Sequence, residues 1–211
     1  MVISVATEEH LKHAEAICEM IADAAKKRGT GIAKRNPEYL RDKIRERKAV
    51  IATDQNKPVG FCYIESWEGN KFVANSGLIV SEQYRKTGLA KMIKAEILRL
   101  SVKKFPESKV FGITTSLAVM KINSDLGYKP VTFSELTDDE LFWNGCKGCV
   151  NYDILQRNNQ NNCLCTAMIY KPKKEPKIIE KNVRGRWENF QRFLKLRKIR
   201  IQKKYKLNIE I

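Results

Sequence analysis

The sequence predicts an α/β domain followed by a basic helical extension. Strand patterns alternate with helix patterns over residues 1–170, which is the order that an α/β fold requires. The length of 211 residues fits one ordinary domain and an extension. The net charge of +16 is concentrated near the C-terminus, because residues 171–211 hold 15 Lys and Arg against 4 Glu. We therefore expect a domain at 1–170, a linker at 171–185 and a basic amphipathic helix at 186–211.

Two helices are predicted before the first pair of strands. Residues 8–27 follow Thr7, a suitable N-cap, and Gly29 and Gly31 end the pattern. A second helix begins at Pro37, which is tolerated in a first helical turn, and runs to about Arg47. The first helix places its apolar side chains at three- and four-residue steps: Leu11, Ala14, Ile17, Ile21 and Ala24.

The remaining elements continue the alternation. Residues 49–53 and 58–67 have the composition of paired strands, joined by a polar turn at residues 54–57. A strand at residues 72–80 leads into a helix at residues 89–104, which ends before Pro106. Beyond it we expect a buried strand at residues 110–115, a helix at residues 117–126 closed by Gly127, and a last strand at residues 163–170.

The turn between the strand at residues 72–80 and the next helix has the composition of an anion site. Gly88 lets the main chain approach a ligand closely, and the helix that follows has unpaired N–H groups at its positive end. Arg85 and Lys86 add positive charge. The sequence therefore predicts a pyrophosphate site formed by Arg85, Lys86, Thr87, Gly88, Leu89, Ala90 and Lys91.

This turn resembles motif A of the GNAT superfamily of acyl-CoA N-acyltransferases, whose Q/R-x-x-G-x-G/A pattern is matched by Arg85, Gly88 and Ala90. Residues 122–131 are similar to the late helix of that family and its glycine–aromatic turn. The resemblance covers roughly residues 1–170. It implies a mixed, twisted sheet flanked by helices and splayed where acyl-CoA enters. It also implies an oxyanion donor in the main chain of Leu78, Ile79 and Val80.

The resemblance further implies that an acceptor amine attacks the thioester directly. Such an amine is mostly protonated at neutral pH, so a carboxylate or an ordered water must accept its proton. Glu65 is our candidate, with a solvated strand carboxylate as the alternative. Many GNAT enzymes have a tyrosine acid for the coenzyme thiolate at the position that Asn123 occupies here. Asn123 remains a coenzyme contact, and the proton must come from water, Ser124 or Tyr128, although Tyr128 also suits a packing role.

The GNAT resemblance implies that the loop between the first two helices, residues 27–36, lines the acceptor site. Arg28, Lys34 and Arg35 would suit an anionic substrate, and a solvated basic loop is the alternative. The segment from Phe111 to Val131, with the Thr114–Thr115 pair, resembles the acyltransferase domain of N-acetylglutamate synthases. That resemblance implies an amino-acid acceptor such as glutamate or ornithine, acetyl-CoA or succinyl-CoA as donor, and a place in arginine biosynthesis.

Two other functions remain open from the sequence. One is a protein, tRNA or ribosome acetyltransferase whose basic tail binds RNA. The other is a non-catalytic sensor that retains the acyl-CoA site, because the tyrosine acid is absent.

Four cysteines form a C-x2-C and a C-x-C pair: Cys146, Cys149, Cys163 and Cys165. Close cysteine pairs separated by a short loop are typical of a structural zinc site, and Gly145 and Gly148 would allow a tight metal knuckle. The alternative is a set of reduced, partly buried thiols. Cys163 and Cys165 would share one face of the last strand.

The basic tail and the N-terminus limit the expected partners. The tail combines aromatic and basic side chains, which leaves open docking on its own domain or on a partner subunit, nucleic acid binding, and contact with an anionic membrane. No apolar run reaches the roughly 20 residues of a transmembrane helix, and Met1–Glu9 lacks a signal pattern. We therefore expect a cytoplasmic protein, with the formation of a homodimer left open.

Overall fold

The computed structural model describes residues 1–28, 35–172, 191–192 and 194–195. The chain divides into two units, Met1–Pro172 and Lys173–Ile211, and the first contains the whole sheet. Most of the predicted linker and tail therefore lies outside the described residues. Within that tail, residues 191–192 and 194–195 are helical. No helix in the described part of the chain is long and apolar enough to cross a membrane.

A mixed seven-stranded sheet forms the centre of the first unit, in the order β1-β2-β3-β4-β5-β7-β6. Strands β1 to β4 pair in antiparallel fashion, β4 pairs with β5 in parallel, and β5, β7 and β6 are again antiparallel. The strands are β1 (Val2–Val5), β2 (Ala49–Asp54), β3 (Lys57–Trp67), β4 (Phe72–Val80), β5 (Lys109–Thr114), β6 (Lys129–Val131) and β7 (Thr166–Tyr170).

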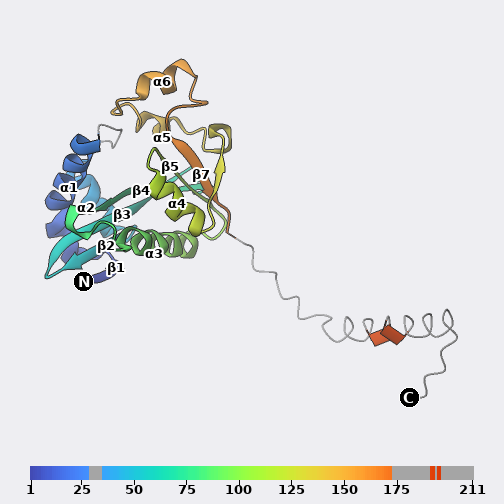
Figure 1. Cartoon of the computed structure of the whole chain (residues 1–211), viewed down its shortest axis with the longest axis horizontal. Coiled ribbons are helices and arrows are strands. Elements are labelled where there is room, and N and C mark those ends of the chain that lie inside the picture. The colour runs from blue at the N-terminus through green and yellow to red at the C-terminus, as the bar shows by residue number, and fades with distance from the viewer. Residues whose placement is uncertain (29–34, 173–190, 193, 196–211) are drawn as a thin grey trace. The chain divides into compact units, whose positions relative to one another are not determined.

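Helices cover both faces of this sheet (Figure 1). Helices α1 and α2 pack on one face of β2 to β4, and α3 and α4 pack on the other, where the largest apolar cluster lies. The helices are α1 (Ala14–Arg28), α2 (Pro37–Arg45), α3 (Leu89–Lys104), α4 (Leu117–Asp125), α5 (Glu140–Asn144) and α6 (Tyr152–Arg157). Short 3-10 turns are η1 (Glu8–His13), η2 (Glu82–Tyr84) and η3 (Phe133–Glu135).

The predicted first helix, residues 8–27, is in fact two elements, η1 and α1. The His10 ring accepts a hydrogen bond from the Thr7 main-chain N–H at 3.1 Å, and the His10 N–H donates to the Thr7 carbonyl. These bonds span three residues, which is the spacing of a 3-10 turn. The strand at β4 and the helix at α3 match their predicted bounds, whereas β1, α5 and α6 were not predicted.

The predicted strand at residues 163–170 is wrong at its start, because β7 begins only at Thr166. The main-chain N–H of Cys165 donates to the Cys163 sulfur at 3.2 Å. This local bond takes a donor that a strand would use in the ladder, so Cys163 and Cys165 lie in a loop.

The sheet separates along its middle. Strand β4 pairs with β5 only through Phe72, Val73 and Ala74. Beyond them, β4 stays with β3, while β5 pairs with β7 through to Thr114. We call the space between residues 75–80 of β4 and residues 112–114 of β5 the opening, and its closed end, at Asn75 and Gly112, the apex.

A bulge in β4 borders the opening. The register with β3 shifts between Phe61 and Tyr63, opposite Gly77, which has a φ of +64°. A Cβ at Gly77 would lie 2.3 Å from the Tyr63 ring. Glycine is therefore required here both for its backbone conformation and for contact with the aromatic ring.

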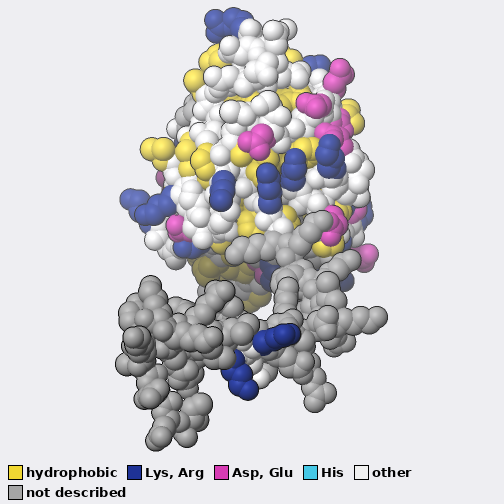
Figure 2. Space-filling model, turned by 90° about the vertical axis from the view of Figure 1, so that its right-hand side faces the viewer, with side chains coloured by type: hydrophobic (Ala, Val, Ile, Leu, Met, Phe, Trp, Pro, Cys, Tyr) yellow, Lys and Arg dark blue, Asp and Glu magenta, His cyan; other side chains and the backbone are white. Residues whose placement is uncertain are grey.

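Charges of both signs cover the domain surface. Figure 2 shows Lys and Arg interspersed with Asp and Glu on one face. Residues 1–170 carry 25 basic and 20 acidic side chains, since the other 15 and 4 follow them. The domain itself therefore carries only a modest basic surplus.

Candidate active site

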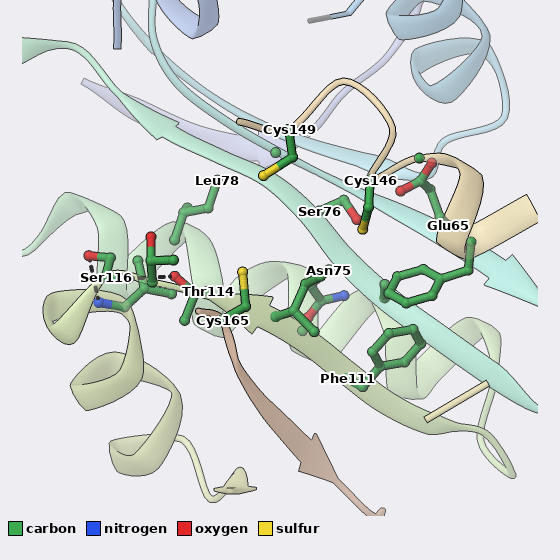
Figure 3. Close-up of a pocket in the computed structure, with 18 of the residues that line it drawn as sticks. Glu65, Asn75, Ser76, Leu78, Phe111, Thr114, Ser116, Cys146, Cys149 and Cys165 are labelled. Atoms are coloured by element: carbon green, nitrogen blue, oxygen red, sulfur yellow. Dashed lines mark hydrogen bonds between the residues drawn. The ribbon is translucent and has the colours of Figure 1, made fainter. Parts of the chain in front are cut away.

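The opening leads into a cavity of about 680 Å³. Its walls come from both separated strands, from the start of α4 and from the segment that follows α5. Figure 3 shows Ser76 and Leu78 of β4, Thr114 of β5, and the cysteine side chains of the later segment around this cavity. The volume is typical of a small-molecule site.

The turn from Ser81 to Gly88 lies where β4 ends and α3 begins. Gly88 has a φ of +87°, and a Cβ added there would meet nothing within 4 Å. Lys86 also has a positive φ, and Thr87 donates its hydroxyl hydrogen to the Tyr84 carbonyl at 2.8 Å. The turn therefore presents an exposed surface at the N-terminus of a 16-residue helix, which attracts anions.

Three buried side-chain atoms in the described residues have no hydrogen-bond partner: Ser81 Oγ, Arg85 Nε and Asn123 Oδ1. Two belong to this turn, and Asn123 lines the cavity. Buried polar atoms are usually satisfied, so unpaired ones mark places where a ligand can bind. Lys91, also predicted as a phosphate contact, forms an ion pair with Asp125 of α4 at 2.7 Å.

On the face of the sheet that α1 and α2 cover, a carboxylate, two tyrosine hydroxyls and an arginine side chain lie close together. Glu65 of β3 accepts a hydrogen bond from the Tyr39 hydroxyl of α2. Arg35 donates to the Tyr63 hydroxyl at 2.5 Å, and the rings of Tyr39 and Tyr63 meet edge to face. Burial and the nearby Glu65 charge raise the pKa of Tyr39 above its usual range, so this phenol remains a donor.

Glu65 is placed at the level of the apex. It lies opposite Ala74 in the β3–β4 register, and Ala74 is the last β4 residue that pairs with β5. Arg35 and Glu65 both line the cavity. Arg35 and Glu65 were both predicted from the sequence. Tyr39 and Tyr63 were not, because neither belongs to a motif or a charged cluster in the sequence.

Of the other residues predicted to bind the acceptor, some line the cavity and some do not. Thr114 and Thr115 line the cavity at the end of β5, where the Thr114 hydroxyl accepts a bond from the Ser116 N–H at 3.1 Å. Lys34 lies outside the described residues. Arg28 is the last residue of α1 and is not among the cavity-lining residues.

The face that α3 and α4 cover carries a buried polar group at the apex. The Asn75 amide donates to Ser101 at 2.7 Å and accepts from the Tyr128 hydroxyl at 2.8 Å. The Lys94 amine lies 3.5 Å from the Asn75 carbonyl and 5.1 Å from the centre of the Tyr128 ring. Only Asn75 and Lys94 of these four residues line the cavity.

The three candidates for the thiolate acid occupy different places. Asn123 is 1% exposed, and its amide nitrogen contacts the Met168 sulfur at 3.7 Å. Ser124 is exposed on α4 and is not a cavity-lining residue. Tyr128 is buried beside Tyr170, and burial raises the pKa of its phenol well above the usual value. The geometry thus gives Tyr128 a packing and hydrogen-bonding position away from the cavity surface.

The predicted zinc site is not supported. In the described part of the chain, which includes all four cysteines, no group of three His, Cys, Asp or Glu side chains could hold a metal ion. Cys146, Cys149, Cys163 and Cys165 instead form part of the cavity wall. Burial raises the pKa of the Cys146 thiol to about 11, so it stays protonated at neutral pH. The nearby Cys163 and Cys149 thiols also raise this pKa, so the cysteines lie near one another without forming a metal-binding group.

No protein-family model matches this sequence, and no curated protein matches it. Solved structures do match. An acetyltransferase of the GNAT family from Bacillus cereus is similar over 82% of this chain and 98% of its own, with 17% identity and a TM-score of 0.53. The chain has the GNAT fold.

Two further solved structures are similar to this chain. N-acetylglutamate synthase from Neisseria gonorrhoeae, complexed with coenzyme A and N-acetyl-glutamate, matches 82% of this chain at 16% identity, with a TM-score of 0.57. The match spans only 35% of that synthase chain. Ribosomal-protein-alanine N-acetyltransferase from Brucella melitensis matches 81% of this chain and 99% of its own, at 13% identity and a TM-score of 0.54.

Proposed function

We propose that this protein is an N-acyltransferase that moves an acetyl group from acetyl-CoA to the amine of a small acceptor bearing a carboxylate. The observation that carries the proposal is that the β4–α3 turn directly follows the β4 edge of the opening, with buried unpartnered polar atoms both in the turn and in the cavity wall. A long ligand with phosphates at one end and a thioester at the other fits this arrangement. The GNAT fold and the acetyltransferase names of similar structures support the same reading.

In this proposal the coenzyme phosphates bind at the turn. Arg85, Lys86 and Thr87 would contact them, together with the main-chain N–H groups of Gly88, Leu89 and Ala90. The arm of the coenzyme would enter the opening and place its thioester toward the apex. Asn123 Oδ1 would accept a hydrogen bond from that arm, which removes the cost of an unpaired buried oxygen.

The main chain of β4 would hold the thioester oxygen. The Ser81 N–H donates to the Val59 carbonyl, so alternation along this antiparallel pair turns the Val80 N–H away from β3 and toward the opening. Fixed donors of this kind stabilise the negative charge that develops as the amine attacks. This supports the predicted role of the Leu78–Val80 segment, at Val80 in particular.

The acceptor amine would approach from the face that α1 and α2 cover. Glu65 is a half-buried carboxylate on that face, at the level of the apex, and it would accept the amine proton. Arg35 would pair with the acceptor carboxylate, with Thr114 and Thr115 on the opposite wall. Glutamate and ornithine remain our acceptor candidates, with arginine biosynthesis as the context, and succinyl-CoA is the alternative donor.

Calorimetry with acetyl-CoA, succinyl-CoA and dephospho-CoA tests the coenzyme site first. We expect binding of at least one acyl-CoA, and we expect Gly88→Val to abolish it. This variant should also melt at a lower temperature and still fold, because valine is strained at a φ of +87°. A thiol-release assay with acetyl-CoA and a panel of amino acids then tests turnover. Absence of binding for every coenzyme A species would refute the proposal.

The same assay separates small acceptors from proteins. Arg35→Ala should raise the Michaelis constant of a carboxylate-bearing acceptor by roughly tenfold, the scale of one charge-assisted pair, and leave that of acetyl-CoA nearly unchanged. If amines without a carboxylate, or peptides, turn over as well as glutamate or ornithine, a protein or ribosome acetyltransferase becomes the better assignment.

A further inference from the structure

Lys94 is a buried amine that the sequence did not single out. It lies in the middle of α3 and is 2% exposed, yet it is one of the residues that line the cavity. Lysine is rarely buried in this way unless an opposite charge accompanies it. No ion pair with Lys94 occurs among the described residues, and its nearest acceptor is the Asn75 carbonyl at 3.5 Å.

The amine occupies the apex of the opening. The Asn75 carbonyl belongs to the first β4 residue beyond the β4–β5 pairs, and Gly112 is its counterpart in β5. A Cβ added to Gly112 would lie 4.0 Å from the Lys94 amine. The lysine amine therefore lies beside both strands at the point where they part.

Titratable neighbours of Lys94 are neutral near pH 7. Burial raises the pKa of the Cys62 thiol on β3 to about 11 and that of the Tyr128 phenol well above its usual value. Asn75 of β4 and Gly112 of β5 carry no charge, and the Glu65 carboxylate lies on the opposite face of the sheet. Desolvation lowers the pKa of the Lys94 ammonium itself, which makes it a stronger acid than an exposed lysine.

We propose that Lys94 is the catalytic acid of this site, contacting the thioester at the apex and protonating the departing coenzyme thiolate. This inference rests on the proposed acyltransferase function. It provides an acid for the thiolate in a site where Asn123 occupies the position of the usual tyrosine acid. An ammonium group without a counter-charge, placed where negative charge develops, stabilises the transition state more than the ground state.

The proton transfers balance across the sheet. The acceptor ammonium first releases one proton to solvent through Glu65. The neutral amine nitrogen then forms the C–N bond as the C–S bond breaks, and the electron pair of the C–S bond stays on sulfur. The sulfur takes a proton from Lys94, while the surplus proton of the amine passes to Glu65. A proton then returns from Glu65 through solvent to Lys94, so the products are an amide and a coenzyme thiol and both side chains are restored.

A spectroscopic experiment tests this role without knowledge of the acceptor. Coenzyme A and desulfo-coenzyme A are each bound to the native protein, to Lys94→Met and to the matched control Lys103→Met, which alters an exposed lysine of the same helix. Desulfo-coenzyme A lacks the sulfur atom, so the difference in ultraviolet absorbance between the two complexes comes from the coenzyme thiol. Measured as a function of pH, this difference gives the fraction of coenzyme thiolate. In the native protein and the control, the thiol should ionise at lower pH than in free coenzyme A, and in Lys94→Met this lowering should be lost.

Turnover of acetyl-CoA with the best acceptor of the amino-acid panel gives the second readout. Lys94→Met should lower kcat at least roughly 100-fold, the lower range for loss of a general acid, while both Michaelis constants stay within about threefold. The native kcat should fall at alkaline pH as Lys94 loses its proton, and this alkaline limb should vanish in Lys94→Met. Lys103→Met should behave as the native protein does.

These results test the role of Lys94 separately from the proposed acyltransferase function. A purely structural lysine would give Lys94→Met a lower melting temperature, with native kcat and an unchanged coenzyme titration, and that result would overturn the inference alone. Failure of the native protein to bind any acyl-CoA would instead overturn the proposed function, and the role of Lys94 with it.

Discussion

The two faces of the sheet differ at the level where β4 and β5 part. The α1–α2 face presents Glu65, a carboxylate hydrogen-bonded by Tyr39 and placed in the same cavity as Arg35. The α3–α4 face presents Lys94, an amine near a neutral amide network and without an ion pair in the described residues. In the proposed mechanism, the proton acceptor lies on one side of the opening and the proton donor lies on the other.

This asymmetry assigns different work to each face. Amide formation from a thioester needs one proton to leave the amine and another to reach sulfur. If one group performed both steps, it would have to contact both reacting atoms in turn. The sheet separates the two groups, so each pKa can be set by its own surroundings.

Replacing the proposed proton acceptor on the α1–α2 face, Glu65, should produce the largest effect. Glu65→Gln keeps the shape and the bond from Tyr39 but removes the proton acceptor, so kcat should fall roughly 100- to 10,000-fold. Steady-state kinetics with acetyl-CoA checks this, with the exposed Glu8→Gln as the control. A Glu65→Gln enzyme with native kcat would show that water performs this step and that the two faces do not divide the work as proposed.

Tyr128→Phe tests whether Tyr128, on the α3–α4 face, has a structural or a catalytic role. It removes the hydroxyl that donates to Asn75 and leaves a buried oxygen unpaired, so the free energy of unfolding should fall by about 1 to 3 kcal/mol. Because Tyr128 does not line the cavity, kcat of the folded enzyme should change less than threefold, within roughly 0.7 kcal/mol. Urea unfolding and kinetics on the same preparation measure both. A large fall in kcat without a stability change would make Tyr128 the acid.

Arg85→Ala should weaken coenzyme binding without changing the proton transfers on either face of the sheet. One charged hydrogen-bond partner of the phosphates is lost, so the dissociation constant of acetyl-CoA should rise roughly tenfold, or about 1.4 kcal/mol. Calorimetry measures it, and kcat at saturation should remain native. An unchanged dissociation constant would mean that the phosphates bind elsewhere.

Tyr39→Phe should give the smallest effect. The hydroxyl bond that holds the Glu65 carboxylate is lost while the carboxylate itself remains. We expect kcat to fall roughly threefold, or about 0.7 kcal/mol, the scale of one hydrogen bond. Steady-state kinetics measures this, and a native kcat would show that Tyr39 does not position the carboxylate.

The sequence predicted what local patterns determine. The strand β4, the helix α3 and the turn between them depend on neighbouring residues, and their predicted bounds agree with the structure. Arg35 and Glu65 were predicted from the GNAT resemblance, and the structure places both in the cavity wall while their roles stay predictions. The zinc prediction is not supported, because cysteine spacing does not fix the path of the loop between Cys149 and Cys163.

Lys94 was missed, although part of its signal is local. Ala90, Ile97 and Leu98 lie three or four residues from it and place it on the apolar side of α3, unlike Lys103. Its amine lies beside Gly112, a strand residue distant in sequence, and no local pattern predicts that contact. Contacts of this kind arise from the packing of α3 against the parted strands, so only the structure reveals them.

The short parallel contact between β4 and β5 has a mechanical consequence. Three residue pairs are the whole strand pairing between β1–β4 and β5–β7–β6, so these two half-sheets meet at a narrow seam. Main-chain amides of residues 75–80 that face the opening have no strand partner there. A ligand held in the opening would therefore bridge the half-sheets, and amide hydrogen exchange along both edges should slow together when it binds.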